Sequence, residues 1–299
     1  MPSRLPTKVE LRRARPLLGT LVEVRATAPT VGQTERALRA AFAAIARVQA
    51  RMSFHESSSD VSRLNRCAHR RAVRVHASTF AVLRRALALH LASAGLFDIA
   101  MAPALVRGGW LPRSGTALPP AGGTAADIAL LADRRVRFRR PLLIDLGGIA
   151  KGFAVDCAVA ALQRHGATAG AVNAGGDLRV FGPSPELVHV RQPESPGELV
   201  PLLQLRDAAV ATSAHYFAQR RIRGIARVPI FHPLRCQLAG EARSVTVQAP
   251  ACWLADALCK IVWLDAAAAA PLLRRYRARA WLLDADRNRP SLVSPLHAA

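Results

Sequence analysis

The segment IDLGGIAKGFAVD, residues 144–156, joins a predicted strand to a predicted helix through two glycines. Asp145 ends the strand, and Gly147 and Gly148 allow a tight turn and a close approach of the backbone. Lys151 follows in the first helical turn, where unpaired N–H groups and the positive end of the helix dipole favour an anion. These features predict a phosphate or nucleotide site. The segment matches neither the G-x-G-x-x-G nor the Walker A pattern, however, so an ordinary strand-to-helix turn is the alternative.

Periodicity on both sides of this segment predicts a mixture of strands and helices. Helices are predicted from Leu38 to Met52 and over 78–94 (with Ser78 as N-cap), 149–165, 253–264 and 266–277, and strands over 20–26, 135–145, 170–181, 187–191, 208–212, 243–249 and 279–284. Ser-rich residues 52–65 predict a loop or a turn-rich segment, and Gly/Pro-rich residues 107–126 predict a loop. This order favours an α+β fold, with mixed or antiparallel sheets packed with helices, over a βαβ alternation.

The composition predicts a globular protein. Of its 299 residues, 51% are hydrophobic and 21% charged, which is too apolar for a disordered chain, and no apolar run is long enough to span a bilayer. We expect an N-terminal tail over 1–14 and one catalytic domain over 15–299. The N-terminus contains no apolar signal-peptide core and no lipobox-like cysteine, so we expect a cytoplasmic protein without a transmembrane segment.

A formal net charge of +22 suggests a polyanionic partner or an arginine-decorated surface. Only Lys8, Lys151 and Lys260 are lysines among the 42 basic residues. No DNA- or RNA-binding motif accompanies the charge, and aromatics are only 5% of the chain, so no specific nucleic-acid partner is expected. The five cysteines show neither C-x-x-C spacing nor a paired histidine, which indicates neither a zinc site nor a disulfide framework.

Two further segments suggest chemistry. In AVNAGGDLRVFG, 171–182, Gly175 and Gly176 interrupt a predicted strand, which marks a bulge or a place where a ligand comes close. In SVTVQAPACWLADALCKIVWLD, 244–265, Asp256 is the single acid in the first half of an apolar helix, where it needs a cation. That cation is either a bound metal ion or Lys260, four residues later on the same helix face.

Seven segments in order resemble the ApbE family of Mg²⁺-dependent FAD:protein FMN transferases. They are RPLLGTLVEV (15–24), MSFHESSSDVSRLN (52–65), FDIAMAPALV (97–106), IDLGGIAKGFAVD (144–156), NAGGDLRVFG (173–182), ATSAHY (211–216) and ADAL (255–258). The resemblance implies that a threonine or serine of a target flavoprotein attacks the FMN-side phosphorus of FAD. FMN is then attached to the target through a phosphoester, and AMP leaves.

The resemblance also implies site residues. Contacts to FAD are expected from Met52, Leu96, Phe97, Asp98, Asp145, Lys151 and Ile230. The Gly148 carbonyl and the Asp256 carboxylate would bind Mg²⁺, an ion that prefers oxygen ligands. Partners are therefore FAD, Mg²⁺ and a flavoprotein acceptor, and a homodimer is possible.

The sequence departs from the family at two positions. Lys260 stands where the family has a threonine or serine metal ligand, and an ammonium cannot bind a cation. Where the family has His-x-x-Asp-Pro, this chain has Pro229 to Pro233, so that His232 replaces the aspartate. His232 is either a substitute catalytic histidine or a solvent-facing loop residue. An impaired flavin-binding member of the family, in which Lys260 takes the place of the metal, is the alternative to an active transferase.

Overall fold

The computed structural model describes residues 8–113, 118–120, 122–193, 195, 197–214, 220–222, 225–239, 243–284 and 290–293. Parts of the expected loop at 107–126, of the segment 211–216 and of both chain ends lie outside these ranges.

Eight of the described strands form one antiparallel sheet. They are β1 (Val9–Leu17), β2 (Thr20–Ala28), β6 (Ala169–Ala174), β7 (Asp177–Phe181), β10 (Ala209–Ala214), β15 (Arg243–Ala249), β16 (Arg279–Asp284) and β17 (Ser291–Leu292), in the spatial order β1-β2-β6-β7-β10-β15-β16-β17. Along β2, Val22, Val24 and Ala26 are buried, and the residues between them are more exposed. This period of two turns one face of the sheet toward the core.

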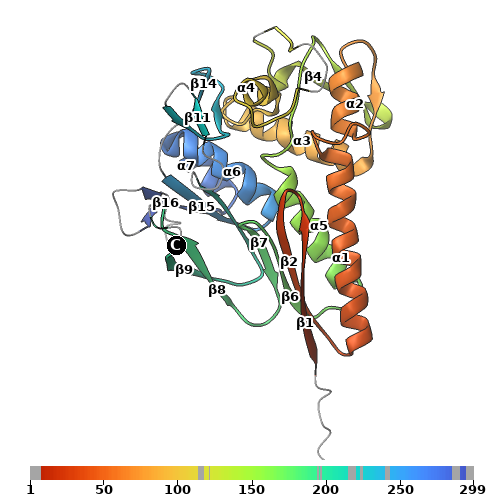
Figure 1. The fold of residues 1–299 in the computed structure, drawn as a ribbon, viewed down its shortest axis with the longest axis vertical. Coiled ribbons are helices and arrows are strands. Elements are labelled where there is room, and N and C mark those ends of the chain that lie inside the picture. Colours follow the sequence, from red (N-terminus) through yellow and green to blue (C-terminus); the bar gives the residue numbers. More distant parts are fainter. Residues whose placement is uncertain are drawn as a thin grey trace, which may run out of the picture.

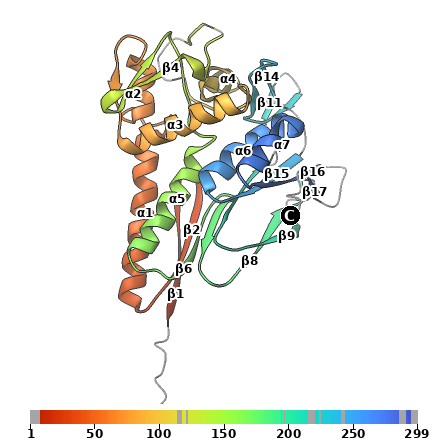
Figure 2. The ribbon, with the colours of Figure 1, turned by 180° about the vertical axis from the view of Figure 1, so that it is seen from behind.

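Helices cover that face of the sheet (Figures 1 and 2). The described helices are α1 (Val31–Met52), α2 (Asp60–Cys67), α3 (Ala77–Ala92), α4 (Ala102–Arg107), α5 (Ala150–Arg164), α6 (Cys252–Leu264) and α7 (Ala266–Arg275), with 3₁₀ turns η1 (Ile99–Met101), η2 (Ala125–Asp127) and η3 (Ala132–Arg134). Helix α1 packs on β1 and β2, α5 on β6 and β7, and α6 on β10 and β15. The α+β class with antiparallel sheets is confirmed.

Smaller sheets flank this core. They are β3 (Val73–Arg74) with β5 (Arg135–Phe138) and β4 (Ile128–Leu131), β8 (Glu186–Arg191) with β9 (Leu199–Leu205), β11 (Arg220–Ile222) with β12 (Ile225–Arg227), and β13 (Phe231–His232) with β14 (Gln237–Leu238). The β8–β9 hairpin packs on the second face of the main sheet, where Val188 and Leu205 meet Ala171, Val180 and Val210 in a small separate core.

Helices α5 and α6 approach each other unusually closely at Gly152. A Cβ atom there would lie 2.6 Å from the carbonyl carbon of Cys252 and 2.8 Å from the Trp253 nitrogen. Asp156, one turn further along α5, accepts hydrogen bonds from the Cys252 and Trp253 N–H groups at 3.0 and 2.9 Å. The carboxylate thereby caps the N-terminus of α6 and fixes this helix relative to α5.

Several sequence expectations are corrected by the structure. Residues 52–65, expected as a loop or a turn-rich segment, contain the start of α2, whose N-cap Ser59 accepts from the Ser62 N–H at 3.0 Å. Residues 9–14, expected as part of a tail, belong to β1. Residues 170–181 form the two strands β6 and β7, because Gly175 and Gly176 both have positive φ and make a two-residue hairpin turn instead of a bulge.

The strand expected over 135–145 ends at Phe138. Beyond it, the backbone of Ile144 pairs with a side chain instead of a strand, since its N–H donates to the Asn65 amide oxygen at 2.8 Å and its carbonyl accepts from the Asn65 amide nitrogen at 3.0 Å. Helix α3 begins after His76, whose ring accepts from the Ser78 N–H, so His76 and not Ser78 is the N-cap.

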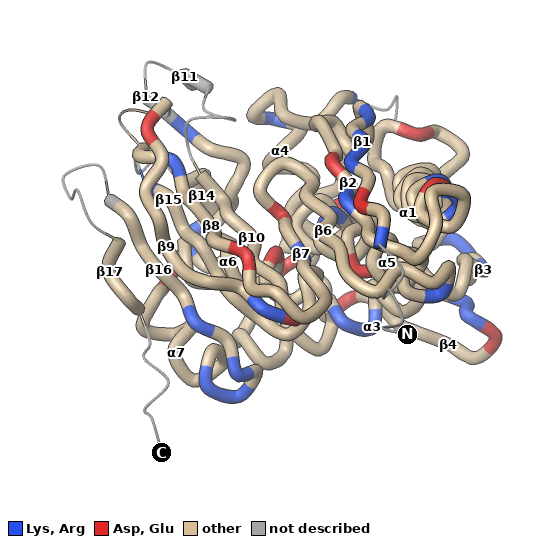
Figure 3. The backbone as a smooth tube through the Cα atoms, turned by 90° about the horizontal axis from the view of Figure 1, so that it is seen from below, with Lys and Arg blue, Asp and Glu red and all other residues tan. Residues whose placement is uncertain are grey.

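Basic residues lie on elements across the molecule, including β1, β3, α7 and β16 (Figure 3). In β1, the edge strand of the sheet, Arg12, Arg13, Arg15 and Pro16 are exposed. Among the described residues, no helix is both long enough and apolar enough to cross a membrane.

Candidate active site

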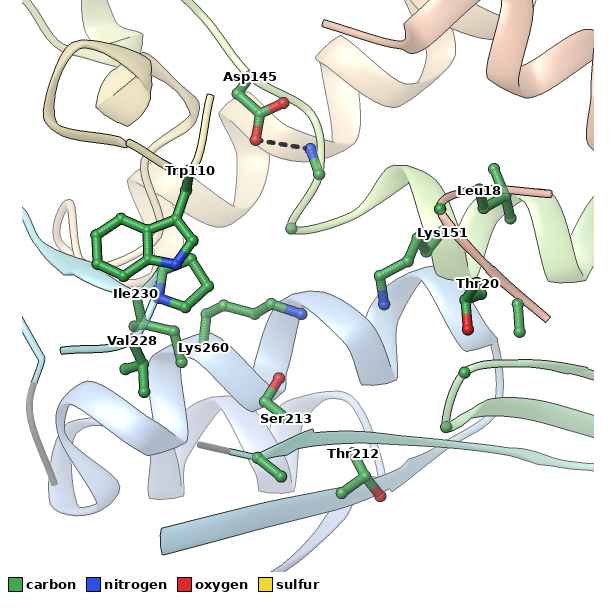
Figure 4. A pocket seen from close by; sticks show the side chains of 18 of the residues that line it. Leu18, Thr20, Trp110, Asp145, Lys151, Thr212, Ser213, Val228, Ile230 and Lys260 are labelled. Carbon is green, nitrogen blue, oxygen red and sulfur yellow. Dashed lines mark hydrogen bonds between the residues drawn. The ribbon is translucent and has the colours of Figure 1, made fainter. Parts of the chain in front are cut away.

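A cavity of about 1180 Å³ opens between the helical layer, the turns of the main sheet and the segment before β13. Its volume is somewhat above the usual range, about 300–1,000 Å³, for sites that bind small molecules and cofactors. The Gly147–Gly148 turn and the first turn of α5 line it, as do the β1–β2 and β6–β7 turns. Figure 4 shows Lys151 and Lys260 reaching into it from α5 and α6, with Trp110 on another wall.

Lys151 is paired with a buried carboxylate. Its Nζ lies 2.6 Å from Oδ2 of Asp177, the first residue of β7, whose side chain is 1% exposed. Burial raises the pKa of Asp177 to about 6, the nearby Asp256 carboxylate adds to this shift, and Lys151 opposes it. Although burial disfavours a charged lysine, the Asp177 and Asp256 carboxylates raise the pKa of Lys151, which therefore remains an ammonium.

Lys260 is paired with the second buried carboxylate. Its Nζ contacts Oδ1 of Asp256 and, at 2.9 Å, the carbonyl oxygen of the same residue. The other carboxylate oxygen, Oδ2, accepts from the Gly152 N–H at 3.1 Å. Burial opposes ionisation of Asp256, but the ammonium groups of Lys260 and Lys151 hold its pKa below the ordinary value. The Asp256–Lys260 ion pair that the sequence offered as one possibility is therefore present, with its carboxylate buried and its ammonium partly exposed.

The two ion pairs place two ammonium groups at the floor of the cavity and two buried carboxylates behind it. The Asp256 side chain is fully buried, whereas 21% of the Lys260 side chain and 34% of the Lys151 side chain are exposed. The carboxylates thus hold the ammonium groups from beneath, and the ammonium groups face the cavity. Such a floor is suited to a ligand with negative charge, because the cations are already oriented before it binds.

Several of the residues expected to contact FAD line the cavity. These are Leu96, Phe97, Asp98, Asp145, Lys151 and Ile230, and Gly148 and Lys260 line it as well. The Asp98 carboxylate is largely used within the protein, since it accepts from the Ala100 N–H at 2.7 Å and from the Ala125 N–H at 3.1 Å. Burial raises its pKa. Asp98 therefore holds the loop around the cavity in place.

Asp145 is half-buried at the end of the segment that leads into the glycine turn. One carboxylate oxygen accepts from the Gly147 N–H at 3.0 Å, as Figure 4 shows, and burial raises the pKa of the group. The side chain is only partly buried and lines the cavity, so Asp145 can also accept hydrogen bonds from a ligand. The sequence placed it at a strand end, but the backbone here is held by Asn65 instead.

Met52 and His232 are not among the residues that line the cavity. Met52 is 3% exposed in the core at the end of α1. His232 is 8% exposed, so it is not the solvent-facing loop residue that the sequence offered as one possibility. Its Nδ1 lies 3.4 Å from the Arg235 nitrogen, and burial lowers its pKa. Its neighbours Ile230 and Phe231 do face the cavity.

Sequence reasoning missed two residues of this site. Asp177 directly follows the glycine pair, and its partner Lys151 lies 26 positions earlier in the chain, so periodicity carries no signal for the contact. Trp110 lies in a Gly/Pro-rich stretch that predicted only a loop, and here the signal was a large aromatic residue among mostly glycine, proline and small residues.

The described residues do not fit a Mg²⁺ ion at the expected position. Mg²⁺ requires near-octahedral oxygen ligands, but one oxygen of Asp256 contacts the Lys260 ammonium and the other accepts from Gly152. Asp177 is similarly engaged by Lys151. Within the described ranges, no group of three or more His, Cys, Asp or Glu side chains is arranged to hold a metal.

Known proteins identify the family of this fold. The ApbE family profile matches residues 18–281, so the chain belongs to the ApbE family. The structure is similar to that of an ApbE protein from Thermotoga maritima, with 25% identity, a TM-score of 0.81 and coverage of 92% of this chain and 94% of that one.

Two further solved structures share the fold. The flavinyl transferase ApbE of Pseudomonas stutzeri is 21% identical, with a TM-score of 0.77 and coverage of 92% of this chain and 91% of that one. The flavin transferase ApbE of Vibrio cholerae is 19% identical, with a TM-score of 0.79 and coverage of 95% and 97%. No curated protein matches the sequence.

Proposed function

We propose that the protein is a flavin transferase that moves FMN from FAD to a threonine or serine hydroxyl of a target flavoprotein and releases AMP. The observation that carries the proposal is the cavity of an ApbE-family chain with two oriented ammonium groups, Lys151 and Lys260, at its floor. FAD supplies the matching chemistry, because it joins a charged pyrophosphate to flat aromatic rings.

The chain's own residues have distinct roles in this proposal. Lys151 and Lys260 bind the pyrophosphate, since charge-assisted hydrogen bonds to phosphate oxygens are strong. Phe97 and Trp110 provide apolar and aromatic walls for the flavin rings. Asp145 accepts hydrogen bonds from polar edges of the ligand. Because Lys260 engages the Asp256 carboxylate, no step of the proposed reaction passes through Mg²⁺ at that position.

The same ion pair favours a second candidate function, a flavin-binding protein of this family that has lost transfer activity. Both carboxylate oxygens of Asp256 have protein partners, so the geometry is complete without a further ion. This protein would retain the cavity and bind FAD without cleaving it.

Incubation of the purified protein with FAD separates the two functions. Free AMP is followed by chromatography, and bound flavin is measured in the same sample. AMP above a no-enzyme blank supports transfer chemistry, whereas bound FAD without AMP supports the flavin-binding alternative. If neither AMP release nor bound FAD is detected, both candidate functions are refuted.

A matched pair of variants tests the site. Lys151→Met removes an ammonium from the cavity and should weaken FAD binding about tenfold or more, as expected for loss of a hydrogen bond to a charged group. Arg164→Met removes an exposed cation from the far end of the same helix, outside the cavity, and should leave FAD binding unchanged. Equal effects of the two variants would indicate general charge attraction only.

A further inference from the structure

The Lys260 ammonium is held in a fixed position at the cavity. An ammonium has three N–H donors, and Asp256 accepts from it through both its carboxylate and its carbonyl oxygen. Asp256 is itself fixed by the Gly152 N–H of the neighbouring helix. Since 21% of the Lys260 side chain is exposed, one donor remains for a ligand in the cavity.

The Lys260 side chain lies within van der Waals range of the glycine turn. A Cβ atom on Gly148 would lie 3.8 Å from Cε of Lys260, so the lysine stem runs beside the turn that precedes α5. Lys151 reaches the same region from the first turn of α5 (Figure 4). The two ammonium groups therefore flank one part of the cavity floor, next to the N-terminus of a helix.

A divalent ion would have to displace these contacts. Bound at Asp256, it would lie beside an ammonium and compete with it for the same carboxylate oxygen. Repulsion between like charges in a partly buried site makes this costly. Occupancy by a bound metal ion depends on the free metal concentration, whereas Lys260 is part of the chain and is always present at the site.

We propose that Lys260 is the resident cation of the transfer site, a catalytic residue that neutralises the FAD pyrophosphate so that the protein works without a divalent metal ion. This inference rests on the proposed function. During transfer the acceptor hydroxyl oxygen forms a bond to the FMN-side phosphorus, and the bond from that phosphorus to the bridging oxygen breaks.

Charge increases on the leaving group during this step. AMP departs with the bridging oxygen and the electron pair of the broken bond. The proton of the acceptor hydroxyl is released to water and is not kept by AMP at neutral pH, because AMP is a phosphate monoester and its second pKa is about 6. No oxidant or reductant is involved. Lys260 stabilises the developing negative charge, which is the general means by which oriented donors accelerate phosphoryl transfer.

The first test uses the unmodified protein with FAD, and compares excess EDTA with excess Mg²⁺. FAD affinity, measured by flavin fluorescence, and AMP release should each agree within about twofold, well below the tenfold that corresponds to 1.4 kcal/mol. Binding of Mn²⁺, followed by its electron paramagnetic resonance signal, should be undetectable at Asp256. AMP release that requires Mg²⁺ would overturn the inference.

The second test replaces the lysine by an oxygen ligand. Lys260→Thr frees the Asp256 carboxylate and adds a hydroxyl, so Mn²⁺ binding should appear and FAD binding should weaken about tenfold in EDTA and recover with Mg²⁺. The matched control is Arg39→Thr, which removes the base of the exposed i,i+4 pair with Glu35 on α1 and should change neither quantity. Lys260→Arg retains the positive charge and should remain insensitive to EDTA.

The outcomes distinguish the inference from the proposed function. If no AMP forms in either condition, the proposed transfer activity fails, but the Mn²⁺ comparison still decides whether Lys260 takes the place of a metal. Mn²⁺ binding to Lys260→Thr and not to the unmodified protein supports the inference. Equal Mn²⁺ binding by both proteins, or by neither, overturns it.

Discussion

Replacement of Gly152 by alanine tests whether the contact between α5 and α6 positions the site. The new Cβ would lie 2.6 Å from the Cys252 carbonyl carbon and closer still to the carbonyl oxygen, whereas ordinary contacts begin at 3.4 Å, so the helices must separate by at least about 0.8 Å. The atoms in the way belong to the backbone and cannot rotate aside. The gain in helix propensity, about 1 kcal/mol, opposes an overpacking cost of about 1–3 kcal/mol or more.

We expect Gly152→Ala to be destabilised by about 1–2 kcal/mol. The same shift stretches the bond from the Gly152 N–H to Asp256 and moves Lys260 away from Lys151. Misplacement of reacting groups by about 1 Å can reduce a rate by about a hundredfold, so any AMP release from FAD should fall more than stability alone would explain.

The control is Gly32→Ala in α1. A Cβ there has only the flexible Arg36 guanidinium nearby, at 3.5 Å, and the substitution should stabilise the protein by about 0.4–1 kcal/mol. Urea unfolding midpoints of both variants provide the measurement. A Gly152→Ala protein as stable as Gly32→Ala, with unchanged activity, would refute close α5–α6 packing as the cause of the site geometry.

Three further predictions concern the charged floor and the aromatic wall. Asp256→Asn leaves a half-buried ammonium without its carboxylate and should cost about 3–5 kcal/mol in urea unfolding, whereas Glu35→Gln at an exposed i,i+4 pair should cost at most about 0.5 kcal/mol; similar costs would contradict the burial argument. The folded-state pKa of Asp177 is raised to about 6, so the folded protein takes up its proton first as the pH falls. Acidification from about pH 7 to about pH 5 should then stabilise the unmodified protein relative to Asp177→Asn, and a difference in unfolding midpoint that does not change with pH would count against this. Trp110→Ala should weaken FAD binding by about 1–3 kcal/mol if the ring stacks on the ligand, as titration of flavin fluorescence would show, and unchanged affinity would remove Trp110 from the binding wall.

Local patterns predicted most of the regular elements of this fold. The helix from Leu38 to Met52 and the strand at 20–26 have clear apolar periodicities, and both are present, although the helix begins earlier, at Val31, and the strand ends later, at Ala28. The strand expected up to residue 145 ends at Phe138, and Asn65, distant in the sequence, satisfies the backbone of Ile144 beyond it. A side chain that replaces a strand partner leaves no mark in local periodicity.

The candidate site was predictable to the extent that its residues share a segment. Asp256 and Lys260 are one helical turn apart, and their ion pair followed from spacing. The contact between Lys151 and Asp177 joins a helix to a sheet strand, and only the tertiary fold brings them together. The burial of Asp256 likewise depends on the packing of α6 against α5. Without this burial, Asp256 and Lys260 would form only a weak surface ion pair, and the ammonium would not be held in one position.

The edge strand β1 limits how the protein can associate with itself. An unpaired strand at a sheet edge is a template for joining the sheet of a second molecule. Here a second copy that aligned its own β1 alongside would bring Arg12, Arg13 and Arg15 close to the same arginines of its neighbour, and Pro16 has no N–H to donate. A continuous sheet across two copies is therefore disfavoured at this edge, and a stable homodimer would have to use another surface.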